Sequence, residues 1–118
     1  MKKEFRIKKR RDFVKVSKSG FYFRTSSLVV CCGLNGLETY RVGFTASKRV
    51  GNAVVRNRCK RRMRAAADIV FDEAGLAGVD YVMIAKKSAF NVKWDVLLKE
   101  TASAARFLND KIKKCGSF

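Results

Sequence analysis

Residues 48–64 hold the densest group of side chains that could do chemistry, because eight cations occur there without an intervening acid. Six of the eight are arginine, whose planar guanidinium donates paired hydrogen bonds that suit phosphate oxygens. A solvated helix face is the alternative, but such a face normally mixes charge signs at i,i+4. The block therefore predicts contacts with phosphate groups. Its cations are Lys48, Arg49, Arg56, Arg58, Lys60, Arg61, Arg62 and Arg64.

A helix over residues 53–71 would carry most of this block, with Gly51-Asn52 as the turn and N-cap before it. At about 100° per residue, Arg58 and Lys60 flank the polar face, and Arg56 and Arg62 lie at its boundary with stems that cover apolar surface. We expect the apolar stripe to pack on a sheet: Val55, Cys59, Met63, Ala66 and Val70. The opposite face is cationic and carries one amide: Asn57, Arg61, Arg64 and Asp68.

Groups that could catalyse a reaction are sparse. The chain has no histidine, the commonest general base, and its ten carboxylates are scattered. Asp68, Asp72 and Glu73 have two interpretations: an acidic metal site, or partners for Arg64 and the neighbouring turn, which we favour. No set of acids matches a two-metal hydrolytic site. The sequence therefore predicts a binding protein without catalytic residues or a metal of its own.

The overall charge points to a polyanionic partner. In 118 residues, 27 Lys and Arg oppose 10 acids, giving a formal net charge of +17. Repulsion among so many like charges destabilises a small fold. Nucleic acid is the first candidate for a partner that neutralises this charge, and an anionic membrane surface is the second. The longest apolar stretch, residues 28–34, is too short to span a bilayer. We expect a cytoplasmic protein with reduced, packed cysteines and no membrane contact.

The elements expected around the basic helix make one domain over residues 1–118. A short helix ends at Gly20 and is followed by strands at residues 21–32 and 40–47, with a turn at Asn35-Gly36 between them. After the basic helix, a third, apolar strand covers residues 81–85, and a last helix covers residues 92–114. The order predicts a small α/β sandwich whose central sheet is flanked by helices. The last helix would bury Trp94, Leu97, Leu98, Thr101, Ala105, Leu108 and Ile112.

The run from Gly51 to Arg64 resembles the signature of the bacterial ribonuclease P protein family. The signature centres on Arg56-Asn57-Arg58 followed by Lys60-Arg61. Residues 41–44 and 47–53 also resemble the family, as do Asp12-Phe13 and residues 18–20. The resemblance covers about residues 5–108.

This resemblance implies a left-handed β-α-β crossover, against the usual right-handed rule, and a 1:1 complex with a catalytic RNA that holds Mg²⁺. It implies that the protein assists hydrolysis that generates the mature 5′ end of tRNA, and that a cleft between the first helix and the sheet binds the precursor's 5′ leader. Phe13, Lys15, Lys18 and Ser47 would line that cleft, although packing of Phe13 on the sheet is an equal alternative. The chain departs from the family at Ser17, where an aromatic residue is common, so strong stacking from that turn is not expected. The expected contacts with the catalytic RNA are Lys48, Arg49, Asn52, Arg56, Asn57, Arg58, Lys60, Arg61, Arg62 and Arg64.

Two other functions share the basic composition. A general basic RNA-binding or ribosomal protein would carry similar charge but should lack the Arg-Asn-Arg helix after a Gly-Asn turn. A DNA-binding module would place a recognition helix in a groove, yet Asn57 is the only obvious base-reading side chain on this helix.

Overall fold

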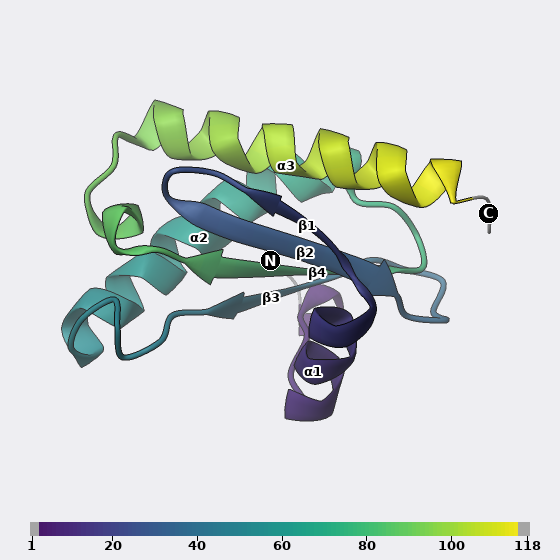
Figure 1. Ribbon diagram of the computed structural model, residues 1–118, viewed down its shortest axis with the longest axis horizontal. Helices are drawn as coiled ribbons and strands as arrows, with labels where there is room; N and C mark the ends of the chain where they lie inside the picture. The colour runs from purple at the N-terminus through teal and green to yellow at the C-terminus, as the bar shows by residue number, and fades with distance from the viewer. Residues whose placement is uncertain (1–2, 116–118) are drawn as a thin grey trace.

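A four-stranded mixed sheet with strand order β1-β2-β4-β3 organises the chain (Figure 1). The computed structural model describes residues 3–115. β1 pairs antiparallel with β2, β2 antiparallel with β4, and β3 parallel with β4. The elements in chain order are η1 (Lys3–Phe5), α1 (Arg10–Ser19), β1 (Phe21–Arg24), β2 (Leu28–Leu34), β3 (Arg41–Thr45), α2 (Ala53–Ala74), β4 (Val79–Ala85), η2 (Lys87–Phe90) and α3 (Trp94–Lys114).

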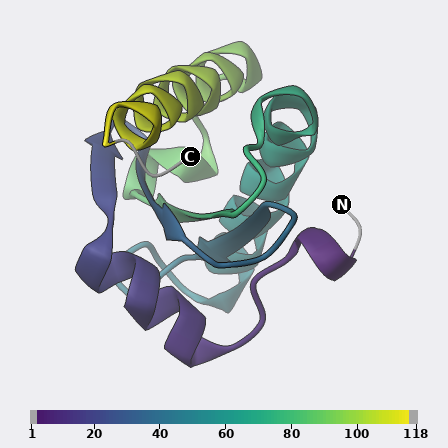
Figure 2. The same cartoon turned by 90° about the vertical axis from the view of Figure 1, so that its right-hand side faces the viewer.

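Helices cover the two faces of the sheet unequally. α2 and α3 lie on one face and α1 on the other, as the end-on view shows (Figure 2). The main core fills the space beneath α2 and α3, where Met63, Phe71, Tyr81 and Leu108 are fully buried. The core under α1 is much smaller and consists of Ile7, Val16, Cys31 and Val82, with Phe13 and Ile84 packed against it. The weaker packing leaves room for a cleft beside α1.

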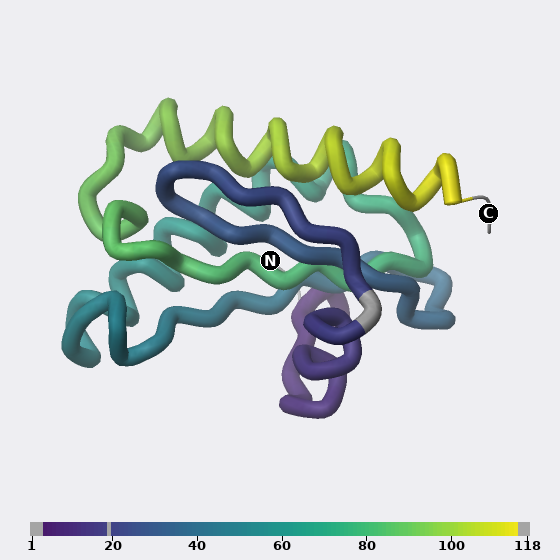
Figure 3. The backbone as a smooth tube through the Cα atoms, in the orientation of Figure 1, coloured from purple at the N-terminus to yellow at the C-terminus, as the bar shows by residue number. Residues whose placement is uncertain are grey.

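The prediction of one strand over residues 21–32 is wrong, because the chain turns at residues 25–27 and forms a hairpin (Figure 3). The Thr25 hydroxyl accepts hydrogen bonds from the backbone N–H of Leu28 at 2.9 Å and of Ser27 at 3.3 Å. Thr25 N–H in turn donates to Leu28 O at 2.8 Å. Hydroxyl side chains that bond the backbone in this way favour turns over extended chain. The sheet therefore has four strands rather than the three expected.

Elsewhere the predicted elements are confirmed with shifted ends. β4 begins at Val79 and so includes Asp80, and α2 continues three residues past Phe71 before Gly75 caps it. The turn at Asn35-Gly36 is present, with Gly36 at a φ of 71° that favours glycine. The buried stripe of α3 is confirmed at five of its seven positions, since Leu98 is half-buried and Trp94 is 41% exposed. Among residues 3–115, none of the helices is long and apolar enough to cross a membrane.

Three of the four cysteines pack inside the protein as predicted, and all four are free thiols. Cys31, Cys32 and Cys59 are buried, whereas Cys115 is exposed at the end of α3. Burial raises the pKa of Cys31 to about 11 and that of Cys32 to about 12. Since the thiolate is the reactive form, these two side chains act as small apolar residues in the native protein.

Candidate nucleic-acid interface

α2 is fixed at its start by the predicted N-cap. Asn52 Oδ1 accepts a hydrogen bond from Val55 N at 3.0 Å, and no acid occupies the first turn. Cys59, Met63 and Val70 are buried and Val55 is half-buried, so the predicted apolar stripe is confirmed. With this stripe against the sheet, the cations are divided between two flanks of one helix.

The flank toward β3 carries Arg56, Lys60 and Arg64, spaced four residues apart. The Arg64 guanidinium carbon lies 5.8 Å from the centre of the Phe44 ring, a cation–π distance. The Nε atoms of Arg56 and Arg64 are buried, and no hydrogen-bond acceptor among the described residues reaches them. Lys60 lines the cleft beside α1. This flank therefore continues the basic surface into the cleft.

The flank toward η2 and α3 carries Arg58 and Arg62, both tied to the backbone after β4. Arg58 Nε donates to Phe90 O at 3.0 Å, and its guanidinium lies 5.2 Å from the centre of the Phe90 ring. Arg62 donates to Ala89 O at 2.6 Å and to Val92 O. Desolvation, and secondarily the charge of Arg58, lower the pKa of Arg62. Arg62 thus uses two of its nitrogens to hold residues 89–92 in place.

The remaining members of the predicted interface face solvent. The loop before α2 closes with a hydrogen bond from Val50 N to Ser47 O at 3.1 Å, and it presents Lys48 and Arg49 next to the start of the helix. Asn57 and Arg61 continue this exposed surface along α2. Loop and helix together form a continuous basic face, to which a phosphate backbone can bind without base-specific contacts.

A cleft of about 490 Å³ lies between α1, the sheet and α2. Of the four residues predicted to line the cleft, only Phe13 does so. Lys18 and Ser47 are not among its lining residues, and Lys15 lines a different hollow beside Phe21. Ser17, at whose position the family often has an aromatic residue, does line the cleft. Its full lining is Lys8, Arg10, Phe13, Val14, Ser17, Cys31, Phe44, Thr45, Ala46, Lys60, Val82 and Ile84.

Sequence reasoning missed the cleft's cations Lys8 and Arg10 and its apolar wall. A signal was available on α1, since Arg10, Phe13, Val14 and Ser17 share one face at spacings of three and four residues. The contribution of the strands could not be inferred in this way, because it depends on which strands lie under α1. The result is an apolar floor with cations at its edges, which suits single-stranded nucleic acid.

Phe13 packs in the small core under α1 and also lines the cleft, while its contact with a leader stays a prediction. Its ring is half-buried against Ile7 and Val16 and also lines the cleft. The ring fits only because residue 43 is glycine: a Cβ at Gly43 would lie 2.5 Å from Phe13 Cε1 and 3.2 Å from Ile7 Cβ. Gly43 therefore sets the depth of the cleft floor.

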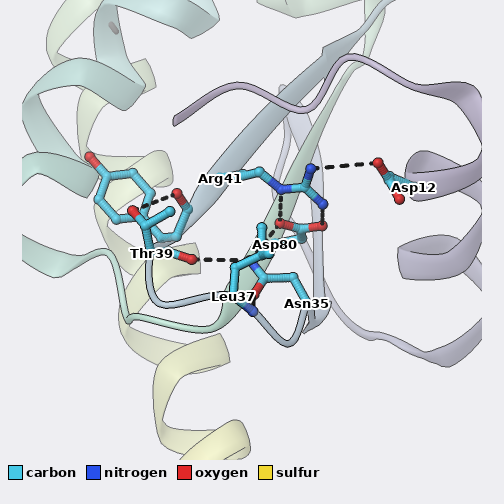
Figure 4. A network of polar contacts seen from close by, with 7 residues as sticks. Asp12, Asn35, Leu37, Thr39, Arg41 and Asp80 are labelled. Atoms are coloured by element: carbon cyan, nitrogen blue, oxygen red, sulfur yellow. Dashed lines mark hydrogen bonds and ion pairs between the residues drawn. The ribbon is translucent and has the colours of Figure 1, made fainter. Parts of the chain in front are cut away.

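A buried ion pair that the sequence did not predict ties α1 to the sheet (Figure 4). Arg41 on β3 donates to Asp80 on β4 through Nε at 2.9 Å and Nη2 at 2.6 Å, and its Nη1 lies 3.5 Å from Asp12 Oδ2 on α1. Asn35 Nδ2 donates to the same carboxylate at 2.8 Å. The hydrogen bond to Asp80 is the main cause of the raised pKa of Arg41. These residues position the cleft and do not line it.

Asp80 was not predicted because the apolar residues 81–85 dominate the pattern of that strand. A signal did exist: Arg41 is the only cation in residues 25–47, and a charge that becomes buried in a sheet needs a partner of opposite charge. The acids at the end of α2 remain less informative. Among residues 3–115, no group of three or more His, Cys, Asp or Glu could hold a metal ion. The pairing of Asp68 with Arg64 stays a prediction.

Comparison with known proteins agrees with this geometry. Residues 1–109 match the family model described as Ribonuclease P. The chain is 41% identical over 106 residues to the ribonuclease P protein component of Ruegeria pomeroyi, covering 87% of this chain and 85% of the relative. The corresponding protein of Paramagnetospirillum magneticum is 37% identical, with 86% and 80% covered.

Solved structures show the same architecture. The Staphylococcus aureus RNase P protein superposes with a TM-score of 0.75 at 27% identity, covering 87% of this chain and 94% of that chain. The Thermotoga maritima RNase P protein gives a TM-score of 0.74 at 25% identity, with 86% and 96% covered.

Proposed function

Because the chain belongs to the bacterial ribonuclease P protein component family, and so is the protein subunit of the endoribonuclease that matures the 5′ end of tRNA, we propose that its basic surfaces bind two different RNAs. The exposed face of α2 and the loop before it bind the catalytic RNA. The cleft beside α1 binds the single-stranded 5′ leader of precursor tRNA. Family membership removes the general or ribosomal RNA-binding alternative.

The position of α2 is the main observation that supports this proposal. One helix borders both surfaces, since Lys60 lines the cleft while Arg58 and Arg61 lie on the other side of the same helix. Phosphates bound to the two surfaces would repel each other strongly without the intervening cations. α2 therefore lowers the repulsion between catalytic RNA and leader and aligns one against the other.

The protein's part in the reaction is binding and alignment. We assign Mg²⁺, which supplies the hydrolytic chemistry, to the RNA partner, with none bound by the protein alone. The catalytic groups are likewise expected on the RNA. What this chain contributes is a cation-edged apolar groove, in which bases stack on rings such as Phe13 while Lys8, Arg10 and Lys60 track the backbone.

Further features follow from the family resemblance. We infer a single RNA-binding domain over residues 1–118, a 1:1 complex with the catalytic RNA, and a cytoplasmic location. We also infer that the crossover from β3 through α2 to β4 is left-handed. The parallel neighbours β3 and β4, joined through α2, are the β-α-β unit to which that handedness applies.

Salt dependence tests the assignment of α2. Replacing Arg61 and Arg64 with Ala should weaken binding to the catalytic RNA and lower the log–log salt slope by about one for each phosphate that the protein no longer neutralises. The matched control replaces Lys99 and Lys114, two exposed lysines of α3, so that equal charge is removed elsewhere. Equal slopes for the two double variants would show that Arg61 and Arg64 neutralise no phosphate of the catalytic RNA.

Leader binding is tested by Phe13→Ala. The variant should bind precursor tRNA more weakly by roughly 1–3 kcal/mol, the range for one stacked base. Mature tRNA, which has no leader, should be affected much less. Thermal melting must be measured alongside, because the ring also packs on Ile7 and Val16. Equal losses for both tRNAs, with much earlier melting, would make Phe13 a structural residue only.

A further inference from the structure

Trp94 lies in a hollow on the flank of α2 that faces away from the cleft. The hollow measures about 260 Å³ and is lined by Arg58, Arg61, Arg62, Ala65 and Trp94. The sequence predicts Trp94 as core, yet it is 41% exposed at the first residue of α3. The exposed indole shares this hollow with three arginines, and the arrangement points to a ligand.

Two of the three arginines are held rigidly by other contacts. Arg58 stacks on Phe90 and donates to its carbonyl, while Arg62 donates to Ala89 O and Val92 O. Their guanidinium groups therefore stay in place without a ligand, and little conformational entropy is lost on binding. Arg61 is exposed at the edge of the hollow and is free to meet an approaching anion.

The chemistry of the hollow fits one nucleotide. An aromatic ring beside fixed guanidinium groups stacks a base and neutralises its phosphate, and such sites take any base because every base has a π-face. The small volume suits one base rather than a larger ligand, for which pockets are usually about 300–1,000 Å³. The absence of acids among the lining residues makes an anionic partner the complementary one.

The hollow and the leader cleft lie in different layers of the protein. α3 and α1 lie on opposite faces of the sheet (Figure 2), and only Lys60 of α2 lines the cleft, whereas Arg58, Arg61 and Arg62 line the hollow. A leader in the cleft would have to pass around α2 to reach Trp94. The catalytic RNA, which the proposed function places on the exposed face of α2, meets the hollow directly.

We propose that the hollow between α2 and the start of α3 binds a single unstacked nucleobase of the catalytic RNA, with Trp94 as its stacking platform. This inference rests on the proposed function. It adds a base-stacking contact to a surface on which most of the other side chains are phosphate donors. Stacking would fix the register of the RNA on α2, which phosphate contacts by themselves do not specify as tightly.

Fluorescence tests the contact directly, because Trp94 is the only tryptophan of the chain. Titration with the catalytic RNA should quench its emission saturably, at the same midpoint as binding measured by filter retention. A short single-stranded oligonucleotide with a leader sequence should leave the emission nearly unchanged at concentrations that fill the cleft. Binding of the catalytic RNA without any change in emission would overturn the site and leave the proposed function intact.

Substitutions measure the strength of the contact. Trp94→Ala should weaken binding to the catalytic RNA roughly 5- to 150-fold, as expected for one stacked base, whereas Trp94→Phe should retain most of the affinity. Phe107→Ala is the matched control, since Phe107 is a 39% exposed aromatic residue of the same helix, and it should bind as the unmodified protein does. Melting curves should show that all three variants are folded at the assay temperature.

The outcomes separate the two proposals. Equal affinities of Trp94→Ala and Phe107→Ala for the catalytic RNA would overturn the stacking site. Equal quenching by leader oligonucleotide and catalytic RNA would overturn its assignment to the catalytic RNA. Failure of every protein, including the unmodified one, to retain the catalytic RNA on a filter would overturn the proposed function together with this site.

Discussion

Removing the carboxylate of Asp80 should destabilise the protein and loosen the cleft. Asp80 is 3% exposed and accepts three hydrogen bonds, two from Arg41 and one from Asn35. In Asp80→Ala the Arg41 guanidinium keeps only the longer contact with Asp12. Because that network joins α1 to β3 and β4, the variant should affect the cleft more than the exposed face of α2.

The magnitude follows from the burial of the pair. Removing one partner of a buried ion pair typically costs about 3–5 kcal/mol, because the remaining charge is left without compensation. The side chain of Arg41 is 19% exposed, so water can reach part of it, and we expect about 3 kcal/mol. For a chain of this length that corresponds to a melting temperature lower by roughly 10 °C.

Urea unfolding of Asp80→Ala, with Asp12→Ala as the control, measures this cost. The Asp12 contact is longer and partly exposed, so its removal should cost at most about 1 kcal/mol. Because the hydrogen bond to Asp80 raises the pKa of Arg41, the contribution of this charge is complete through the neutral range and is lost only at strongly alkaline pH. The difference between the variants should therefore be the same at pH 6 and pH 9.

Binding measurements complete this test. Asp80→Ala should lose affinity for precursor tRNA more than for the catalytic RNA, since α1 is the element released. An unfolding free energy within 1 kcal/mol of the unmodified protein, or the same value as for Asp12→Ala, would refute the assigned role of the network.

Two further predictions concern the packing around α1 and the sheet. Gly43→Ala should cost roughly 1–3 kcal/mol in urea unfolding, the range for overpacking, because the new Cβ would lie 2.5 Å from Phe13 Cε1; a stability within 0.5 kcal/mol of the unmodified protein would argue against the tight fit. Ellman's reagent at pH 8 should modify Cys115 rapidly, whereas Cys31 and Cys32, whose pKa values are raised by burial, should react only as the protein unfolds. Rapid modification of more than one thiol in the native protein would show that the sheet is more open than described.

Local patterns were sufficient to predict α2. Its apolar stripe, its Asn52 cap and its charged flanks depend on residues within a few turns of one another, and helical periodicity reports such neighbours well. The structure confirms the stripe and the cap, but it moves Arg64 from the predicted solvent face to the flank toward β3, where its guanidinium lies over the Phe44 ring. The basic interface on this helix could accordingly be proposed from sequence.

Features that depend on distant residues could not be predicted. Asp80 and Arg41 are 39 positions apart and meet only because β3 and β4 pair in parallel. Trp94 follows the apolar spacing of α3 but precedes the segment that lies against the sheet, so it stays exposed. The cleft lining likewise combines α1, three strands and α2, an arrangement fixed by the order of strands in the sheet.

Cleavage of precursor tRNA by the reconstituted enzyme tests the central claim most directly. The catalytic RNA, the protein and precursor tRNA are combined at a Mg²⁺ concentration at which the RNA alone is slow, and the 5′ product is measured. The protein should accelerate cleavage at the mature 5′ end, should do so less with a precursor whose leader is shortened to one nucleotide, and should release no product without the RNA. Cleavage by the protein alone, or acceleration that does not depend on leader length, would contradict the division of labour proposed for α2 and the cleft.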